Sequence, residues 1–224
     1  MNDKLKLEVN LKVFAAELVG TFALVFIGAG AVALKADLLT VALAHGLVLA
    51  AFFYAFGAIS GTHINPAVTF GLALNGTIKW VEAIYYWIGQ FIGAVLAAAL
   101  LYFLLGKANN NLGATVLHTG VSPLKGLIVE AVLTFFLVTV FLQTAVANNG
   151  KDLAGMAIGL TLAFAMMMGG PLTGGSLNPA RTFGPAIFTG TFNQFWIYLI
   201  GPLAGAALAV LLFKFLGQAQ KMKA

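Results

Sequence analysis

The amino-acid sequence predicts an all-α membrane protein with six transmembrane helices and two half-helices, arranged as an inverted repeat. Three observations support this fold class. Hydrophobic residues make up 61% of the 224 residues and charged residues only 8%, whereas a soluble domain carries about 25% charged residues. Several uncharged runs reach the roughly 20 residues that a helix needs to cross a bilayer. The segment Asn-Pro-Ala occurs twice, at 65–67 and 178–180, within apolar sequence.

Helices are expected in the long apolar runs because the strands of a membrane barrel would alternate over about ten residues, and these runs do not alternate. The N-terminal stretch MNDKLKLEVNLK is too charged for the core of a signal peptide, so the first run is interpreted as a retained helix. The chain has no cysteine, which excludes disulfides. The expected transmembrane helices are about 12–34, 38–57, 80–105, 124–146, 153–170 and 194–216.

An internal repeat relates the two halves of the chain. Glu17 and Glu130 each begin a Glu-x-x-x-Thr-Phe segment, and they lie 113 residues apart, as do Asn65 and Asn178. Each half, about 12–106 and 124–216, contains three expected transmembrane helices. Because three is odd, the second half must enter the membrane from the opposite face. We therefore expect one membrane domain, residues 1–224, made of two inverted halves.

The lysines predict the orientation of the chain in the membrane. By the positive-inside rule, the face that carries more lysine is cytoplasmic. We therefore expect both termini to be cytoplasmic, with the cell membrane as the host. One face of the expected topology carries Lys4, Lys6, Lys12, Lys79, Lys151, Lys214, Lys221 and Lys223, and the other carries Lys35, Lys107 and Lys125.

Each Asn-Pro pair is typical of a helix start. Asparagine is a good N-cap, and proline is tolerated at the first helical position because its missing N–H would be unpaired there. The two short helices are expected to end near Leu74 and Phe188. About ten residues cover about 15 Å, half of the ~30 Å hydrocarbon core. Two such half-helices from opposite faces would meet at the midplane with their N-termini facing.

The segments before the half-helices are expected to be irregular backbone, which is tolerated at membrane depth only where it lines a water-filled cavity or is buried in protein. Two helix N-termini, each with roughly half a positive charge, would disfavour cations there. Capping leaves the amide N–H groups of both asparagines as donors, so a water molecule between them would point its hydrogens outward and interrupt proton transfer. The expected pore-lining backbone residues are Gly61, Thr62, His63, Ile64, Gly174, Ser176 and Leu177.

The segments ExxxTF in both halves, SGTHINPAVTFG and GGSLNPARTFGPA resemble the aquaporin (major intrinsic protein) family over essentially the whole chain. The resemblance implies a homotetramer with one pore in each subunit. It also implies that the two motifs form the centre of the pore, through Asn65, Pro66, Ala67, Asn178, Pro179 and Ala180.

Arg181 is the only charged residue between Leu153 and Phe213, and a charge inside a membrane indicates function. The resemblance implies that Arg181 belongs to an outer selectivity filter together with His45, Met166 and Gly175. In that filter Gly175 would widen the constriction. The combination is similar to that of the plant tonoplast intrinsic subfamily, whose members often pass ammonia as well as water.

The glutamate pair, His118 and His63 each have two alternative interpretations. Glu17 and Glu130 are expected to accept hydrogen bonds from the irregular loops, although a proton-coupled carrier would also use buried carboxylates. His118 is either an exposed loop residue or a residue that reaches the filter. His63 either borders the inner vestibule or has a packing role.

The sequence favours a passive channel for water and small neutral solutes such as ammonia that excludes protons and ions. A glycerol or small-polyol facilitator is the alternative, although facilitators follow the filter arginine with aspartate where this chain has Thr182. A secondary transporter is a further alternative, since inverted repeats with broken helices also describe carriers. We expect no enzyme activity, cofactor, metal site or nucleic-acid partner, and we expect contact with membrane lipid.

Overall fold

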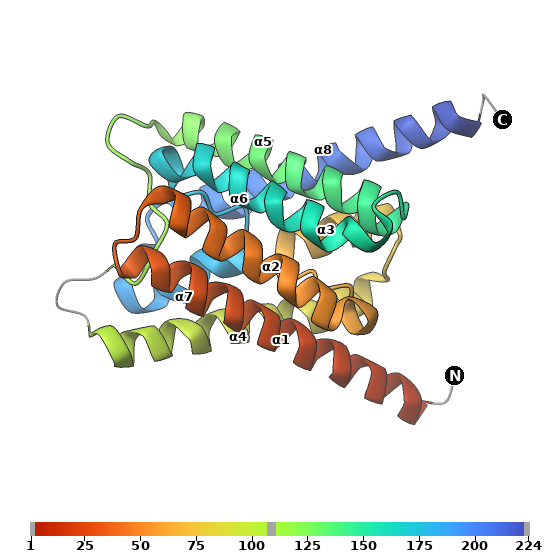
Figure 1. Ribbon diagram of the computed structural model, residues 1–224, viewed down its shortest axis with the longest axis horizontal. Helices are drawn as coiled ribbons and strands as arrows, with labels where there is room; N and C mark the ends of the chain where they lie inside the picture. The colour runs from red at the N-terminus through yellow and green to blue at the C-terminus, as the bar shows by residue number, and fades with distance from the viewer. Residues whose placement is uncertain (1–2, 107–110, 222–224) are drawn as a thin grey trace.

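The computed structural model describes residues 3–106 and 111–221 as a bundle of helices that all run roughly along one direction (Figure 1). Lys107 and Lys223, two of the lysines in the orientation prediction, lie outside the described residues. The elements are α1 (Asp3–Ala33), α2 (Leu38–Ser60), α3 (Pro66–Asn75), α4 (Trp80–Leu105), α5 (Pro123–Phe141), a π-helical turn (Leu142–Val146), a 3-10 turn (Lys151–Leu153), α6 (Ala154–Thr173), α7 (Pro179–Thr189) and α8 (Phe195–Lys221).

Six helices in the described part of the chain are long and apolar enough to cross a membrane, which confirms the predicted number. The predicted spans 12–34, 124–146 and 194–216 agree to within two residues with the spans Asn10–Ala33, Pro123–Val146 and Phe195–Gly217, although α1 and α8 extend beyond them. Helix α1 extends back to Asp3, because its charged first residues include good helix formers that remain helical outside the apolar core. Helix α8 likewise continues to Lys221, and the predicted helix over 124–146 ends as an α-helix at Phe141.

Helices α2 and α6 each run three residues further than predicted. Each ends at a glycine in the left-handed region, Gly61 with φ 79° and Gly174 with φ 79°. Glycine adopts this conformation without the steric penalty of a Cβ atom. Pro171 does not end α6, because the helix continues for a further two residues. The two glycines are 113 residues apart, so the repeat preserves the way the chain leaves each helix.

The inverted repeat is visible in the helix packing. Helix α1 packs along α4, α5 packs along α8, and α2 packs along α6 across the centre of the molecule. Gly46 of α2 and Gly159 of α6 face each other there, and a Cβ atom on either would overlap the carbonyl oxygen of the other. Small residues of this kind allow close contact of transmembrane helices. Both chain ends lie at the same end of the bundle (Figure 1).

The half-helices α3 and α7 begin where the sequence predicts. The side chain of Asn65 accepts a hydrogen bond from the N–H of Ala67, and that of Asn178 accepts from the N–H groups of Ala180 and Arg181. With 10 and 11 residues, each helix covers about half of the ~30 Å core. Helix α3 packs against α8 and α7 packs against α4, so each half-helix is supported by a full transmembrane helix.

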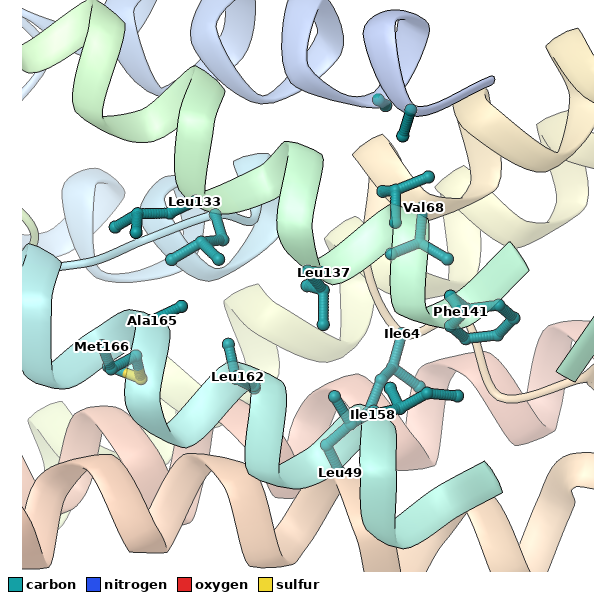
Figure 2. Packing of buried hydrophobic residues seen from close by; sticks show 14 of the residues in the cluster. Leu49, Ile64, Val68, Leu133, Leu137, Phe141, Ile158, Leu162, Ala165 and Met166 are labelled. Carbon is teal, nitrogen blue, oxygen red and sulfur yellow. The ribbon is translucent and has the colours of Figure 1, made fainter. Parts of the chain in front are cut away.

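A buried apolar cluster fills the space between α2, α3, α5, α6 and α8 (Figure 2). It includes Leu137 and Phe141 from α5, Ile158 and Leu162 from α6, and Val68 from α3. The same five side chains line the narrow passage described below. One wall of the hydrophobic core is therefore also a wall of the candidate pore.

Candidate pore

Two cavities meet at Arg181. The outer cavity has a volume of about 380 Å³, and the inner passage has a volume of only about 10 Å³. A volume of roughly 10–15 Å³ is the room that a single water molecule requires, so the path narrows sharply beyond Arg181. The passage is lined by Leu24, His45, Leu49, His63, Ile64, Asn65, Val68, Leu137, Phe141, Ile158, Leu162, Ser176, Asn178 and Arg181.

Asn65 and Asn178 lie where the two half-helices meet. Beyond its capping role, the side-chain Nδ2 of Asn65 donates to the carbonyl oxygen of Leu177 at 2.9 Å. Nδ2 of Asn178 donates to the carbonyl oxygen of Ile64 at 2.8 Å. An amide NH₂ has two hydrogens, so each asparagine keeps one further N–H. The amide groups are thus donors, as expected, but one N–H of each is already used, because the irregular segment of each half reaches across to the asparagine of the other.

The irregular segments have strained backbone. Thr62 (φ 51°), Ile64 (φ 40°) and Leu177 (φ 55°) are non-glycine residues in the left-handed region, which costs of order 1–3 kcal/mol each. Of the predicted backbone residues, His63, Ile64 and Ser176 line the inner passage, and Gly174 lines the outer cavity. The residues that line neither cavity are Gly61, Thr62 and Leu177, together with the motif residues Pro66, Ala67, Pro179 and Ala180.

Two buried glutamates hold these strained segments in place. Glu17 accepts hydrogen bonds from the backbone N–H groups of His63 at 2.9 Å and Ile64 at 2.6 Å. Glu130 accepts from the N–H groups of Ser176 at 3.0 Å and Leu177 at 2.7 Å. Both carboxyl groups therefore lie behind the loops and not on the passage, an arrangement that suits a scaffold.

The two glutamates also bind side chains, and here the halves differ. Glu17 accepts from the Ser60 hydroxyl at 2.6 Å and from the Gln90 amide at 2.7 Å. Glu130 accepts from the Thr173 hydroxyl at 2.6 Å. The segments GQFIGA (89–94) and GPLAGA (201–206) correspond with an offset of 112, so the counterpart of Gln90 is Pro202, which has no side-chain donor. The sequence analysis missed Gln90, although the mismatch with a proline in the repeat was a visible signal.

Arg181 and His45 form the narrow outer end of the passage. The Nη1 atom of Arg181 donates to the carbonyl oxygen of Gly113 at 2.6 Å, a contact that no sequence signal indicated. The Nδ1 atom of His45 lies 2.9 Å from the carbonyl oxygen of Val41. A carbonyl oxygen only accepts, so Nδ1 carries the proton and Nε2 of the neutral ring is an acceptor.

Each of these two residues has a buried polar atom without a partner. Nε2 of His45 and Nε of Arg181 have no hydrogen-bond partner among the described residues. The ring of His45 lies against Gly28 of α1, since a Cβ atom on Gly28 would overlap Nε2. Both residues line the passage, so the outer constriction combines an imidazole ring with a guanidinium group.

The other two predicted filter residues, Met166 and Gly175, do not line the inner passage. Met166 is buried and lines the outer cavity. Gly175 lines neither cavity, and a Cβ atom on it would lie 3.3 Å from Cα of Met166 and 3.1 Å from the backbone nitrogen of Gly170. Its absent side chain therefore faces α6, and the glycine allows the loop to pack closely there. Because a side chain at position 175 would point toward α6, its absence does not agree with the prediction that Gly175 widens the constriction.

The three histidines have different surroundings. His118 is exposed and lines the outer cavity with Arg181, and its backbone N–H donates to the carbonyl oxygen of Leu172 at 3.0 Å. His63 is buried at the inner end of the passage. Its ring stacks on Tyr86 with a centroid separation of 4.3 Å, and its Nδ1 lies 3.1 Å from the hydroxyl of Thr69. His63 thus both borders the passage and packs.

Comparisons with known proteins agree with this geometry. Residues 4–213 match the family model described as major intrinsic protein. A probable aquaporin TIP2-2 of Oryza sativa subsp. japonica is 39% identical, over 92% of this chain and 87% of that protein. The glycerol uptake facilitator protein-like 6 of Lactiplantibacillus plantarum is 41% identical, over 92% of this chain and 99% of that protein.

A solved structure shows the same fold. The aquaglyceroporin from Plasmodium falciparum superimposes with a TM-score of 0.83 at 25% identity, covering 91% of this chain and 95% of that chain. Together with the match to the family model over most of the sequence, this establishes what the two half-helices and their asparagines indicate. The chain belongs to the major intrinsic protein, or aquaporin, family of membrane channels.

Proposed function

We propose that this aquaporin-type channel passes water, together with small neutral solutes such as ammonia, and excludes protons and other ions. The observation that carries the proposal is the passage of about 10 Å³ that Arg181 and both asparagines line. Its size suits molecules that travel one at a time. Members of this family are channels, and we propose no enzyme activity and no cofactor for this chain.

Exclusion of cations follows from the charges along the passage. The N-termini of α3 and α7 meet near the asparagines, and each carries roughly half a positive charge. The guanidinium of Arg181 adds a full charge, and the passage is too narrow for a cation to keep its hydration shell. Since burying an unpaired charge is costly, cations meet both repulsion and desolvation.

Exclusion of protons follows from the orientation of water between the asparagines. Asn65 and Asn178 each keep one N–H after their bonds to Leu177 and Ile64. A water molecule that accepts from both directs its own hydrogens toward the two ends of the passage. Such a molecule cannot accept a proton from either neighbour, so proton transfer along the file of water stops there.

Ammonia permeation is proposed from the acceptor of His45. His45 lines the passage, and the unpartnered Nε2 of its neutral ring is the atom that would accept a hydrogen bond from ammonia. In His45→Phe this acceptor is replaced by an apolar ring, and we expect the ratio of ammonia to water permeability to fall about tenfold, the effect of losing one hydrogen bond of roughly 1.4 kcal/mol. Ammonia-driven pH change and osmotic shrinkage in the same proteoliposomes measure the ratio. An unchanged ratio contradicts the role of His45.

A polyol facilitator is the second candidate, because one relative is named a glycerol uptake facilitator protein-like 6 and the solved structure is an aquaglyceroporin. The volume of the inner passage favours water. Stopped-flow light scattering separates the two candidates. The proposal expects fast osmotic shrinkage with a low activation energy and little glycerol uptake. Glycerol uptake well above that of empty vesicles, with slow water flux, would favour the facilitator instead.

The orientation and assembly are part of the same proposal. The chain is an integral, multi-pass membrane protein with six membrane-spanning helices among its described residues. We propose that both termini face the cytoplasm and that four copies assemble, each with its own pore. The plant relatives carry the name TIP and do not support the cell membrane expected as host.

A further inference from the structure

The residues that line the inner passage are related by the repeat. His45 and Ile158, Leu49 and Leu162, and Val68 and Arg181 are pairs with the offset of 113, and both members of each pair line the passage. The outer end contains His45 and Arg181, and the inner end contains their apolar partners Ile158 and Val68. At these paired positions the outer end is therefore polar and the inner end apolar.

Phe141 departs from this symmetry. It lines the passage, and the residue related to it by the repeat is Gly28. At the outer end, Gly28 lies against the ring of His45, and a Cβ atom on Gly28 would overlap that ring. The small residue there makes room for the filter histidine. At the inner end the corresponding position carries the largest apolar side chain of the passage, which is 3% exposed.

Phe141 has aromatic neighbours at the inner end. Its ring lies edge-on to that of Phe53 at 6.0 Å and to that of His63 at 5.9 Å. Phe53 in turn lines a further cavity, of about 410 Å³, with Asn148 and Lys151. Phe141 lines the passage, and its ring contacts that of Phe53, a residue of this second cavity. In Figure 2 its ring lies beside Ile64 and Val68.

The backbone also differs between the halves at this point. Phe141 is the last α-helical residue of α5, and the π-helical turn Leu142–Val146 follows directly. The corresponding stretch of α1, residues 29–33, is a regular α-helix. The hydroxyl of Thr144 donates to the carbonyl oxygen of Val140 at 2.7 Å, a bond that bends helices.

We propose that Phe141 and His63, which both line the passage, form an inner constriction that limits the size of permeating solutes, in series with the outer filter, with Phe53 packed against Phe141. This inference rests on the proposed channel function and adds a specificity-determining residue at the opposite end of the pore. Because two constrictions in series each set a resistance, widening the outer one alone leaves the inner one limiting for molecules larger than water. Phe141 offers no hydrogen bond to a polyol that has shed its water.

The test compares Phe141→Ala, His45→Ala and the double variant in proteoliposomes, with glycerol and water as probes. We expect glycerol permeability of the double variant to exceed that of either single variant about tenfold, a typical effect of size on selection in an apolar pocket. Phe136→Ala on the same helix is the matched control, because this side chain is 45% exposed on the outer surface of the helix, and it should change neither permeability.

A second variant tests the constriction in the opposite direction. Phe141→Trp enlarges the ring and should reduce water permeability several-fold, whereas Phe136→Trp should not. Equal glycerol permeability in the double variant and in His45→Ala, or unchanged water flux in Phe141→Trp, would overturn the inference while leaving the water channel intact. Absence of water flux in the unmodified protein would instead overturn the proposed function.

Discussion

Replacing Glu17 with leucine is expected to destabilise the protein more than any other single change considered. The carboxylate accepts from two backbone N–H groups of the irregular segment, those of His63 and Ile64, and from the side chains of Ser60 and Gln90. Leucine removes the acceptor of all four. Although the Gln90 amide keeps its bond to the Thr69 hydroxyl at 2.9 Å, the two backbone N–H groups are left buried without a partner. At about 1–3 kcal/mol for each unsatisfied group, the two backbone groups alone cost about 2–6 kcal/mol.

The measurement is the melting temperature in detergent, together with water permeability after reconstitution. The melting temperature of Glu17→Gln should lie between those of the unmodified protein and Glu17→Leu. The amide keeps one accepting oxygen, but its NH₂ group places a donor opposite the donors of the loop. The melting temperature should fall less in Glu130→Leu than in Glu17→Leu, since Glu130 lacks a counterpart of the Gln90 hydrogen bond. If Glu17→Leu melts within a few degrees of the unmodified protein and conducts water normally, the carboxylate is not the anchor of the loop.

Replacing Arg181 with valine is expected to weaken the exclusion of cations. Valine is the natural residue at the repeat-related position 68, so the substitution makes the two ends of the passage alike. A unit charge at about 5 Å, with an effective dielectric constant of about 20, changes the energy of another charge by about 3 kcal/mol. A difference of this size corresponds to about a hundredfold change in cation permeability.

Ion currents across planar bilayers, recorded in parallel with osmotic water flux, provide the measurement. Lys125→Val is the matched control, because Lys125 is exposed at the start of α5 and does not line the passage. It should leave both quantities unchanged. A cation current in Arg181→Val no larger than in Lys125→Val would show that the half-helices alone exclude cations and that Arg181 has another role.

Much of the fold was predictable because its signals are local or repeated. Asn-Pro marks a helix start wherever it occurs, and its two copies at the offset of 113 placed both half-helices correctly. Long apolar runs gave the six transmembrane helices. Helix ends were harder to predict, because α1 and α8 continue past the apolar core as helices whose charged residues carry no stop signal.

The missed features of the site depend on contacts between segments far apart in the chain. The bond from Arg181 to the Gly113 carbonyl joins α7 to a loop 68 residues away. The asparagine side chains bond across the two halves, at separations of 112 and 114 residues. The spacing of residues within one segment gives no indication of such contacts with a distant segment. Phe141 was assigned no function from the sequence, since one phenylalanine among 19 in an apolar chain is not distinctive until the cavity shows what it lines.

The central claim is that the paired asparagines let water pass and stop protons. It is tested most directly by measuring proton current and osmotic water flux in the same proteoliposomes, with a pH gradient applied in one arm and a sucrose gradient in the other. The account predicts rapid water flux with a low activation energy and a proton flux no greater than that of empty vesicles. A proton current comparable with the water flux would contradict it.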